Sequence, residues 1–145
     1  MRMRELAILL CCALAACGKK KEEGGGGGHA HDEPGPHGGE ILDLGGGAYH
    51  LEILHDHDGG SMKVWILDSA MKETIPVPAP VVNLVTKGGP VQFTLTPGAT
   101  LEGNLALEWH GAHDGLKVDP WDGRIVLNIK GKTFQSPLEG EAHKH

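Results

Sequence analysis

The sequence predicts an all-β protein, an antiparallel β-sandwich of about seven strands with immunoglobulin-like proportions. Five short segments alternate apolar and polar side chains with a period of two, which is typical of half-buried strands. Glycine, proline and aspartate separate these segments at spacings of about ten residues, as in small sandwiches. No segment longer than a single turn has the period of an amphipathic helix. A small barrel is the alternative architecture.

The first two strands are expected at residues 49–55 and 62–67, joined as a hairpin. The Asp-Gly-Gly sequence of residues 58–60 is the clearest turn signal in the chain, and Asp-Gly pairs favour short hairpin loops. His50 occupies a polar position of the first strand, so its side chain is expected to be exposed. The apolar side chains that alternate in this hairpin are Tyr49, Leu51, Ile53, Met62, Val64 and Ile66.

The middle of the chain contains a break and then two more strands. The Val-Pro-Ala-Pro sequence of residues 77–80 marks an edge or a crossover, because proline lacks the N–H that a central strand needs. Residues 91–96 and 105–110 then alternate again. Their apolar positions are Val91, Phe93, Leu95, Leu105, Leu107 and Trp109.

The last two strands form a second hairpin. Residues 124–130 alternate through Ile125, Leu127 and Ile129, and the Lys-Gly-Lys sequence that follows supplies a tight turn. Residues 133–136 then return as the partner strand.

Residues 1–16 have the features of a secretory signal: a positively charged start, a short apolar run and small residues before Cys17. The apolar run is about half of the roughly 20 residues that a membrane-spanning helix needs. Leu14-Ala15-Ala16-Cys17 resembles a lipobox, the processing site of bacterial lipoproteins. The resemblance implies that Cys17 is lipidated, becomes the mature amino terminus and anchors the protein to a membrane of the cell envelope. An ordinary secretion signal with a chance cysteine is the alternative.

The mature chain is expected to contain one domain between two unstructured ends. Residues 17–35 are expected to be a flexible tether, because a charge run and five consecutive glycines have little to bury. Residues 36–138 form the β-sandwich domain, which is long enough for one modest core. Residues 139–145 form a disordered tail. Residue 18, directly after the expected lipidated cysteine, is glycine. An acidic residue there would resemble an inner-membrane retention signal, so the glycine favours the outer membrane.

Composition argues against several functions. Removal of the signal takes away two arginines and one glutamate, which brings the net charge from −6 to −7, whereas nucleic-acid binding depends on Lys and Arg. With Cys11 and Cys12 removed and Cys17 lipidated, no thiol is left for a disulfide, a nucleophile or a soft metal site. The three serines lack a nucleophile-elbow context. We therefore expect neither nucleic-acid binding nor catalysis.

Histidine is the residue type that stands out, with ten copies, all of them after the signal. Neutral imidazole binds zinc and copper(II). His55 and His57 flank a carboxylate at the first hairpin, and His110 and His113 lie in a later loop. Two imidazoles from each would complete a four-coordinate zinc or copper(II) site, with an affinity that falls as the rings protonate below about pH 6.5.

Other interpretations of the histidines stay open. His55 is in phase with the apolar side chains of its strand and can cap the core, and a His-Asp loop is often a plain turn. His29, His31 and His37, in the tether and at the domain entrance, are weaker metal candidates. A flexible His-x-His segment loses conformational entropy when it binds.

Several motifs resemble those of a family of small uncharacterised bacterial lipoproteins. This family shares a His-Gly-Gly opening (here residues 37–39), a Tyr-His-x-Glu strand (49–52), a strand ending in Leu-Asp (67–68) and a late Ile-x-Gly-Lys ribbon (129–132). The resemblance covers most of residues 36–136 and implies an envelope β-sandwich without an established activity. A similar His-Gly-Gly opening occurs at the front of some periplasmic adaptor subunits of heavy-metal efflux pumps, which favours a metal function.

Two functions follow from these observations. The first is a lipid-anchored envelope protein that binds zinc or copper(II) through surface histidines. The second is a structural or interaction module whose sandwich surface or edge strand docks another envelope protein. The His-Asp hairpin favours the first function, and the lack of one compact ligand set favours the second.

Overall fold

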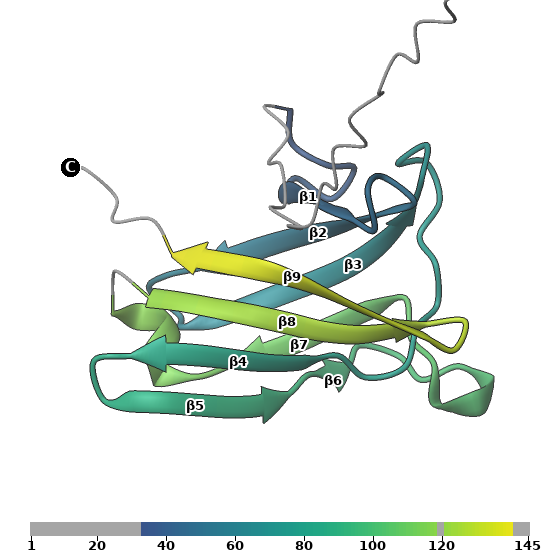
Figure 1. Ribbon diagram of the computed structural model, residues 1–145. Coiled ribbons are helices and arrows are strands. Elements are labelled where there is room, and N and C mark those ends of the chain that lie inside the picture. The colour runs from purple at the N-terminus through teal and green to yellow at the C-terminus, as the bar shows by residue number, and fades with distance from the viewer. Residues whose placement is uncertain (1–32, 119–120, 141–145) are drawn as a thin grey trace, which may run out of the picture.

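The protein is a sandwich of two antiparallel β-sheets (Figure 1), as predicted. The computed structural model describes residues 33–118 and 121–140, and these contain nine strands instead of about seven. One sheet has the strand order β1-β2-β3-β7-β6, and the other has the order β5-β4-β8-β9. The strands are β1 (Glu40–Leu44), β2 (Tyr49–Asp56), β3 (Ser61–Asp68), β4 (Val81–Thr86), β5 (Gly89–Thr94), β6 (Thr96–Pro97), β7 (Glu108–Ala112), β8 (Trp121–Ile129) and β9 (Lys132–Gly140).

Both predicted hairpins are present. β2 and β3 pair along their whole lengths and end with Asp56 opposite Ser61, at the predicted Asp-Gly-Gly turn. β8 and β9 end with Ile129 opposite Lys132, and the turn between them contains a glycine at φ 82°, a conformation that glycine adopts without strain. β9 continues to Gly140, past the expected domain boundary.

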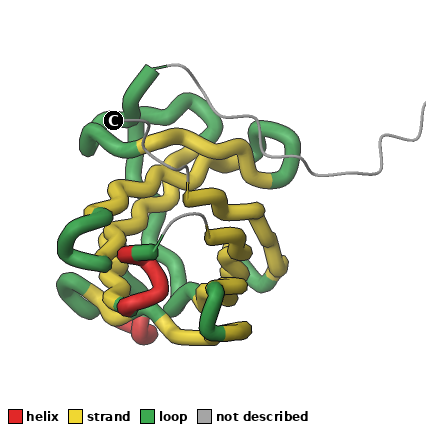
Figure 2. The backbone as a smooth tube through the Cα atoms, turned by 90° about the vertical axis from the view of Figure 1, so that its left-hand side faces the viewer, coloured by secondary structure: helices red, strands yellow, loops and turns green. Residues whose placement is uncertain are grey.

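The core lies between the two layers of strands (Figure 2). Inward side chains come from alternate positions of each strand, because successive side chains of a strand point to opposite faces. The chain passes between the sheets at Leu95, which joins β5 to β6 and donates its N–H to the Pro80 carbonyl (3.0 Å). Among the most enclosed core side chains are Leu44, Leu51, Met62, Ile66, Leu84, Leu116 and Ile125.

The second face of β2 and β3 is also buried, which corrects the alternation expected there. His50, expected to be exposed, is only 5% exposed, and Glu52 is completely buried. Residues 37–39 lie against this face through hydrogen bonds to Glu52, and Thr74 forms a bridge with Leu67. Segments distant in the sequence therefore close a face that the strand pattern alone assigns to solvent.

The strand predicted at residues 105–110 is shifted toward the carboxyl end. β7 begins at Glu108, and the preceding chain turns through the short 3-10 helix η1 (Glu102–Asn104). Leu107 is therefore 42% exposed, whereas Trp109 keeps its predicted core position. The turn breaks the period of two, so the apolar phase does not continue through the whole predicted segment.

Among the described residues, no helix is long and apolar enough to span a membrane. The predicted signal, Cys17, His29, His31 and the chain beyond Gly140 lie outside the described residues.

Candidate functional site

The carboxylate of Glu52, in the middle of β2, is completely enclosed. Its Oε1 accepts hydrogen bonds from the backbone N–H groups of His37 (2.7 Å) and Gly39 (3.0 Å). Its Oε2 pairs with Nδ1 of His37 at 2.7 Å. These partners compensate the carboxylate for its loss of water, which a buried charge requires.

Glycines allow residues 35–39, here called the amino-terminal turn, to lie this close to β2. A Cβ at Gly35 would lie 2.5 Å from Cδ of Glu52, and a Cβ at Gly39 would lie 2.5 Å from a backbone oxygen of β2. Gly38 has φ 83°, where any other residue is strained. Two backbone bonds close the turn, from Gly38 N–H to the Gly35 carbonyl (2.9 Å) and from Gly35 N–H to the Gly39 carbonyl (2.8 Å).

The imidazole of His37 also stacks on the indole of Trp65, with ring centroids 4.4 Å apart and planes 1° from parallel. The Nε1–H of Trp65 donates to Oε2 of Glu108 at 3.1 Å. Glu52, Trp65 and Glu108 lie directly opposite one another on β2, β3 and β7. His37 is thereby held at one nitrogen by a carboxylate and across its ring face by an indole.

Glu108 also contacts two basic side chains on the same sheet face. It bonds the ring of His110, and its Oε1 lies 3.9 Å from Nζ of Lys63. Partial burial raises the pKa of Glu108, but the hydrogen bond and charge of His110 and the charge of Lys63 outweigh burial, so this pKa lies below its ordinary value of 4.5. Glu108 is therefore ionised at neutral pH.

His55 and His57 lie beside each other at the first hairpin, with ring centroids 6.2 Å apart. Nε2 of His55 lies 3.0 Å from the Leu116 carbonyl in the short 3-10 helix η2 (Asp114–Lys117). The edge of the His55 ring also contacts Trp121, with centroids 5.4 Å apart. A carbonyl only accepts, so Nε2 of His55 donates, and Nδ1 is the nitrogen left for a metal ion.

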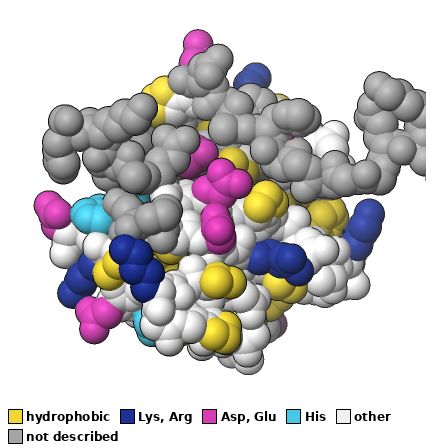
Figure 3. All heavy atoms as spheres, turned by 60° about the vertical axis from the view of Figure 1, so that its left-hand side comes forward, with side chains coloured by type: hydrophobic (Ala, Val, Ile, Leu, Met, Phe, Trp, Pro, Cys, Tyr) yellow, Lys and Arg dark blue, Asp and Glu magenta, His cyan; other side chains and the backbone are white. Residues whose placement is uncertain are grey.

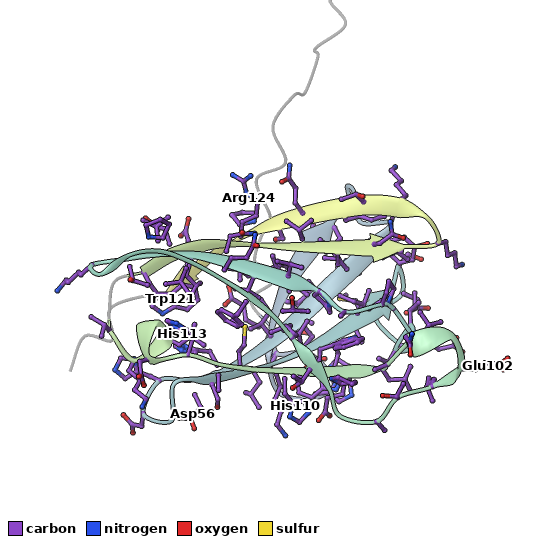
Figure 4. All side chains as sticks on the ribbon, turned by 90° about the horizontal axis from the view of Figure 1, so that it is seen from below. Asp56, Glu102, His110, His113, Trp121 and Arg124 are labelled. Atoms are coloured by element: carbon purple, nitrogen blue, oxygen red, sulfur yellow. The ribbon has the colours of Figure 1, made fainter. Side chains whose placement is uncertain are left out.

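His110 and His113 lie apart from each other along the molecule (Figure 4). His113 stacks on Phe93 with centroids 5.6 Å apart, and its Nδ1 accepts the N–H of Gly115 at 2.9 Å. His110 lies with Glu108 on the outer face of the five-stranded sheet. These contacts use Nε2 of His110 and Nδ1 of His113. The other nitrogen of each ring takes no part in them.

The structure thus brings His55 and His57 together, but it places His110 on another surface. Within the described part of the chain, no group of three or more His, Cys, Asp or Glu residues is arranged to hold a metal ion. Binding of zinc or copper(II) by the four-histidine set stays a prediction.

The partners of His37 were not foreseen from the sequence, since Glu52 and Trp65 both occupy positions that alternation assigns to solvent. The sequence nevertheless contains an indication that Glu52 is buried. Glu52 lies between Leu51 and Ile53 in an otherwise apolar stretch, and a carboxylate buried in such a strand needs donors from elsewhere in the chain.

The outer face of the four-stranded sheet is different, because its side chains are exposed or half-buried. Two rows of residues lie opposite one another across β5, β4, β8 and β9. Gln92 donates to Asn83 within one row (2.6 Å), and Arg124 of that row donates to Gln135 of the other row (3.3 Å). The eight residues of the two rows, here called the open face, are Val81, Asn83, Gln92, Thr94, Arg124, Val126, Gln135 and Pro137.

No protein family matches this chain, and no curated protein or solved structure matches it. Its function therefore has to be inferred from the geometry itself.

Proposed function

We propose that this protein is a lipid-anchored binding module of the bacterial cell envelope, whose open face docks another envelope protein. The observation that carries the proposal is the difference between the outer faces of the two sheets. The amino-terminal turn covers part of one outer face, over Glu52 and Trp65. The open face, on the other sheet, keeps its side chains exposed or half-buried in the described part of the chain.

The position of the amino-terminal turn supports this arrangement. The turn follows Cys17 in the sequence and lies against the five-stranded sheet. The open face belongs to the opposite sheet. A lipid on Cys17 would then hold the domain at the membrane while the open face stays available to a partner.

The composition of the open face suits a protein partner. Charged residues are depleted at the centres of protein interfaces, and Arg124 is the one charged residue among the eight. A guanidinium binds a carboxylate through two parallel hydrogen bonds, so we expect an acidic side chain opposite Arg124 on the partner. On the side of the molecule shown in Figure 3, acidic and basic side chains are interspersed, an arrangement that favours a mixed protein surface over a polyanion.

Site-specific photo-cross-linking in intact cells tests the docking surface. A cross-linking residue at Gln92, on the open face, should give one discrete protein adduct. The same residue at Lys63, which is 49% exposed on the other sheet, should not give that adduct. Arg124→Glu should abolish the adduct without changing the far-ultraviolet circular dichroism spectrum. Equal adducts from both positions, or an adduct indifferent to Arg124→Glu, would refute docking at this face.

Membrane fractionation tests the anchor. Cys17→Ser removes the sulfur that would carry the lipid, so the protein should leave the membrane fraction or accumulate with its signal uncleaved. Mass spectrometry of the wild-type protein should find acyl chains on Cys17. An unlipidated mature mass, with unchanged fractionation of the variant, would contradict anchoring.

Metal handling is the second candidate function, favoured by the ring separation of 6.2 Å between His55 and His57. Two neighbouring imidazoles can share one zinc or copper(II) ion. Calorimetric titration of each metal is the test. Binding weaker than about 100 μM, or unchanged by His55→Ala together with His57→Ala, would exclude this pair as the site.

A further inference from the structure

We propose that two copies of this protein form a dimer through β5, with the two β5 strands paired antiparallel about Gln92. In the described part of the chain, β5 pairs only with β4 and forms the lower edge of the sheet in Figure 1. The other edge strand of this sheet, β9, lies beside the five-stranded sheet, where the ring of its Phe134 contacts Tyr49 at 5.6 Å. β5 is therefore the edge that a further strand can join.

The register of β5 on β4 determines which backbone groups face this edge. Leu95 continues the register opposite Pro80 and donates its N–H to the Pro80 carbonyl (3.0 Å). Along an antiparallel pair, hydrogen-bonded positions alternate with positions whose backbone groups point away from the partner strand. The N–H and C=O groups of Gln92 and Thr94, and the C=O of Pro90, consequently point away from β4.

The sequence of this edge suits pairing with a second copy. Residues 89–97 contain no charged side chain, whereas natural proteins often protect an exposed edge strand with charges, lysine above all. The chain as a whole carries a net charge of −6, so two copies repel each other over most of their surfaces. At β5 they can approach without bringing like charges together.

The outward backbone groups of β5 are also complementary to those of a second copy. When Gln92 lies opposite Gln92 of the second copy, Thr94 lies opposite Pro90 of that copy. Each N–H of Gln92 and Thr94 then has a carbonyl to bond across the interface, from Gln92 and Pro90 of the other copy. Proline lacks an N–H, but Pro90 falls at the end of the paired segment, so it interrupts none of these bonds.

The inward side chains of β5 favour the same register. Val91 and Phe93 are half-buried, although their neighbours on β4, Leu84 and Val82, are 1% and 0% exposed. In the dimer, Val91 lies opposite Phe93 of the second copy, at a position where side chains approach closely. Pairs of an aromatic and a β-branched residue stabilise sheets, and this pair covers apolar surface that one sandwich alone leaves half open.

The dimer goes beyond the proposed docking function and does not depend on it. An antiparallel pair of identical strands has a two-fold axis perpendicular to the sheet, and dimers with two-fold symmetry are the commonest oligomers. The two four-stranded sheets would form one continuous sheet. Both open faces would lie on the same side of that sheet.

Introduced cysteines test the dimer and its register. The chain used is residues 17–145 with Cys17→Ser, which contains no other cysteine. Gln92→Cys places two thiols opposite each other, with Cα atoms about 5.5 Å apart, which a disulfide can bridge. Oxidation in a glutathione buffer should therefore give a covalent dimer. Thr94→Cys, the matched control, leaves its two thiols roughly 14 Å apart and should stay monomeric.

A mixture of two single variants tests the pairing of Pro90 with Thr94. Equimolar Pro90→Cys and Thr94→Cys should give the mixed disulfide, because residue 90 of one copy lies opposite residue 94 of the other. Neither variant should form a covalent dimer when it is oxidised alone.

Sedimentation velocity of the same chain without introduced cysteines measures the affinity. We expect a reversible dimer with a Kd below about 100 μM. Gln92→Pro removes an N–H that each copy donates across the interface, so the affinity should fall by at least about tenfold. This substitution removes no bond to β4, and Pro90 already occupies an equivalent outward position. Gln92→Ala, the matched control, keeps the N–H, and its Kd should stay within about threefold of the wild type.

These outcomes are separate from docking at the open face, because the purified protein contains no other partner. In cells, an adduct of Gln92 with a second copy has twice the mass of the monomer, which distinguishes it from an adduct with another protein. A protein that stays monomeric up to about 1 mM would overturn the dimer. Equal covalent dimer in Gln92→Cys and Thr94→Cys, or equal affinities of Gln92→Pro and Gln92→Ala, would also overturn pairing through β5.

Discussion

At the scale of single residues, Glu52 shows what a carboxylate needs in order to lie inside a small sandwich. Its three hydrogen bonds all come from His37 and Gly39, which the chain brings to β2 only by wrapping the amino-terminal turn over the sheet. The burial of Glu52 and the position of this turn therefore depend on each other.

Glu52→Ala removes the acceptor of these three bonds and leaves the buried N–H of Gly39 and the partly buried donors of His37 without a partner. We expect the free energy of unfolding, measured by urea denaturation, to fall by about 2–4 kcal/mol. Asp114→Ala is the control, because Asp114 is 93% exposed in its ion pair with Lys117 and exposed ion pairs contribute little to stability. A smaller loss for Glu52→Ala than for the control would contradict the burial of Glu52.

A second carboxylate, Asp68, closes the turn after β3. Its Oδ1 accepts the backbone N–H groups of Glu73 (3.1 Å) and Lys72 (2.8 Å), and these bonds hold the pKa of Asp68 below its ordinary value of 3.8. A carboxyl group whose pKa is lowered by folding stabilises the fold above the ordinary pKa. That contribution is lost as the pH falls through the lowered pKa.

Asp68→Ala should therefore unfold at a lower temperature than the wild type at neutral pH, and the difference should shrink as the pH falls below the ordinary pKa of 3.8. Thermal unfolding followed by circular dichroism across this range measures it. Asp68→Asn retains a side-chain oxygen as acceptor but carries no charge, so its difference from the wild type should be smaller than that of Asp68→Ala and should also shrink as the pH falls. A gap between Asp68→Ala and the wild type that stays constant down to pH 2 would show that these bonds do not depend on the charge.

At the scale of elements, β7 passes close to the place where the chain changes sheets. A Cβ at Gly111, in β7, would lie 2.5 Å from Cδ2 of Leu95 and 2.8 Å from Cε2 of Phe93. Leu95 is a buried core residue, so it has little freedom to move aside. The glycine thus allows the crossover between β5 and β6 to pack against β7.

Gly111→Ala should lower the free energy of unfolding by about 1–3 kcal/mol, because overpacking forces neighbours out of their preferred rotamers. Gly88→Ala is the matched control. A Cβ at Gly88 would meet only Oγ1 of Thr86, at an ordinary 3.6 Å, so the change should stay within about 0.5 kcal/mol. Equal urea midpoints for the two variants would refute the close approach at β7.

At the scale of the whole molecule, the two sheets share one core but have different outer faces. Trp109 and Trp121 belong to the core, whereas Trp65 lies under His37 in the outer layer of the five-stranded sheet. Hydrogen bonds and stacking connect that layer to β2, β3 and β7. We infer that the outer layer and the core form one cooperative unit.

Urea unfolding followed by tryptophan fluorescence and by far-ultraviolet circular dichroism should therefore give superimposable transitions, as expected of a small two-state domain. Trp65→Phe should lower the common midpoint without separating the two curves, because phenylalanine lacks the indole N–H that donates to Glu108. An early fluorescence transition that disappears in Trp65→Phe would show that the outer layer melts separately.

The sequence by itself determined the fold class and the positions of the two hairpin turns of this protein. The period of two in residues 62–67 and 125–129 identified strands, since successive side chains of a strand face opposite sides. Asp-Gly-Gly and Lys-Gly-Lys located both hairpin turns, because glycine adopts the backbone conformations that such turns require. These signals lie within a few neighbouring residues, so they can be interpreted without knowing the rest of the structure.

Only the tertiary structure decided which faces are covered and which histidines meet. Alternation shows that a strand has two faces, but not whether a distant segment lies over the second one, as the amino-terminal turn does over Glu52. Spacing alone likewise placed His110 with His55, although the register of β7 puts it beside Glu108 instead. Contacts between residues far apart in the sequence depend on how the sheets pack, and a pattern within one segment carries no information about that packing.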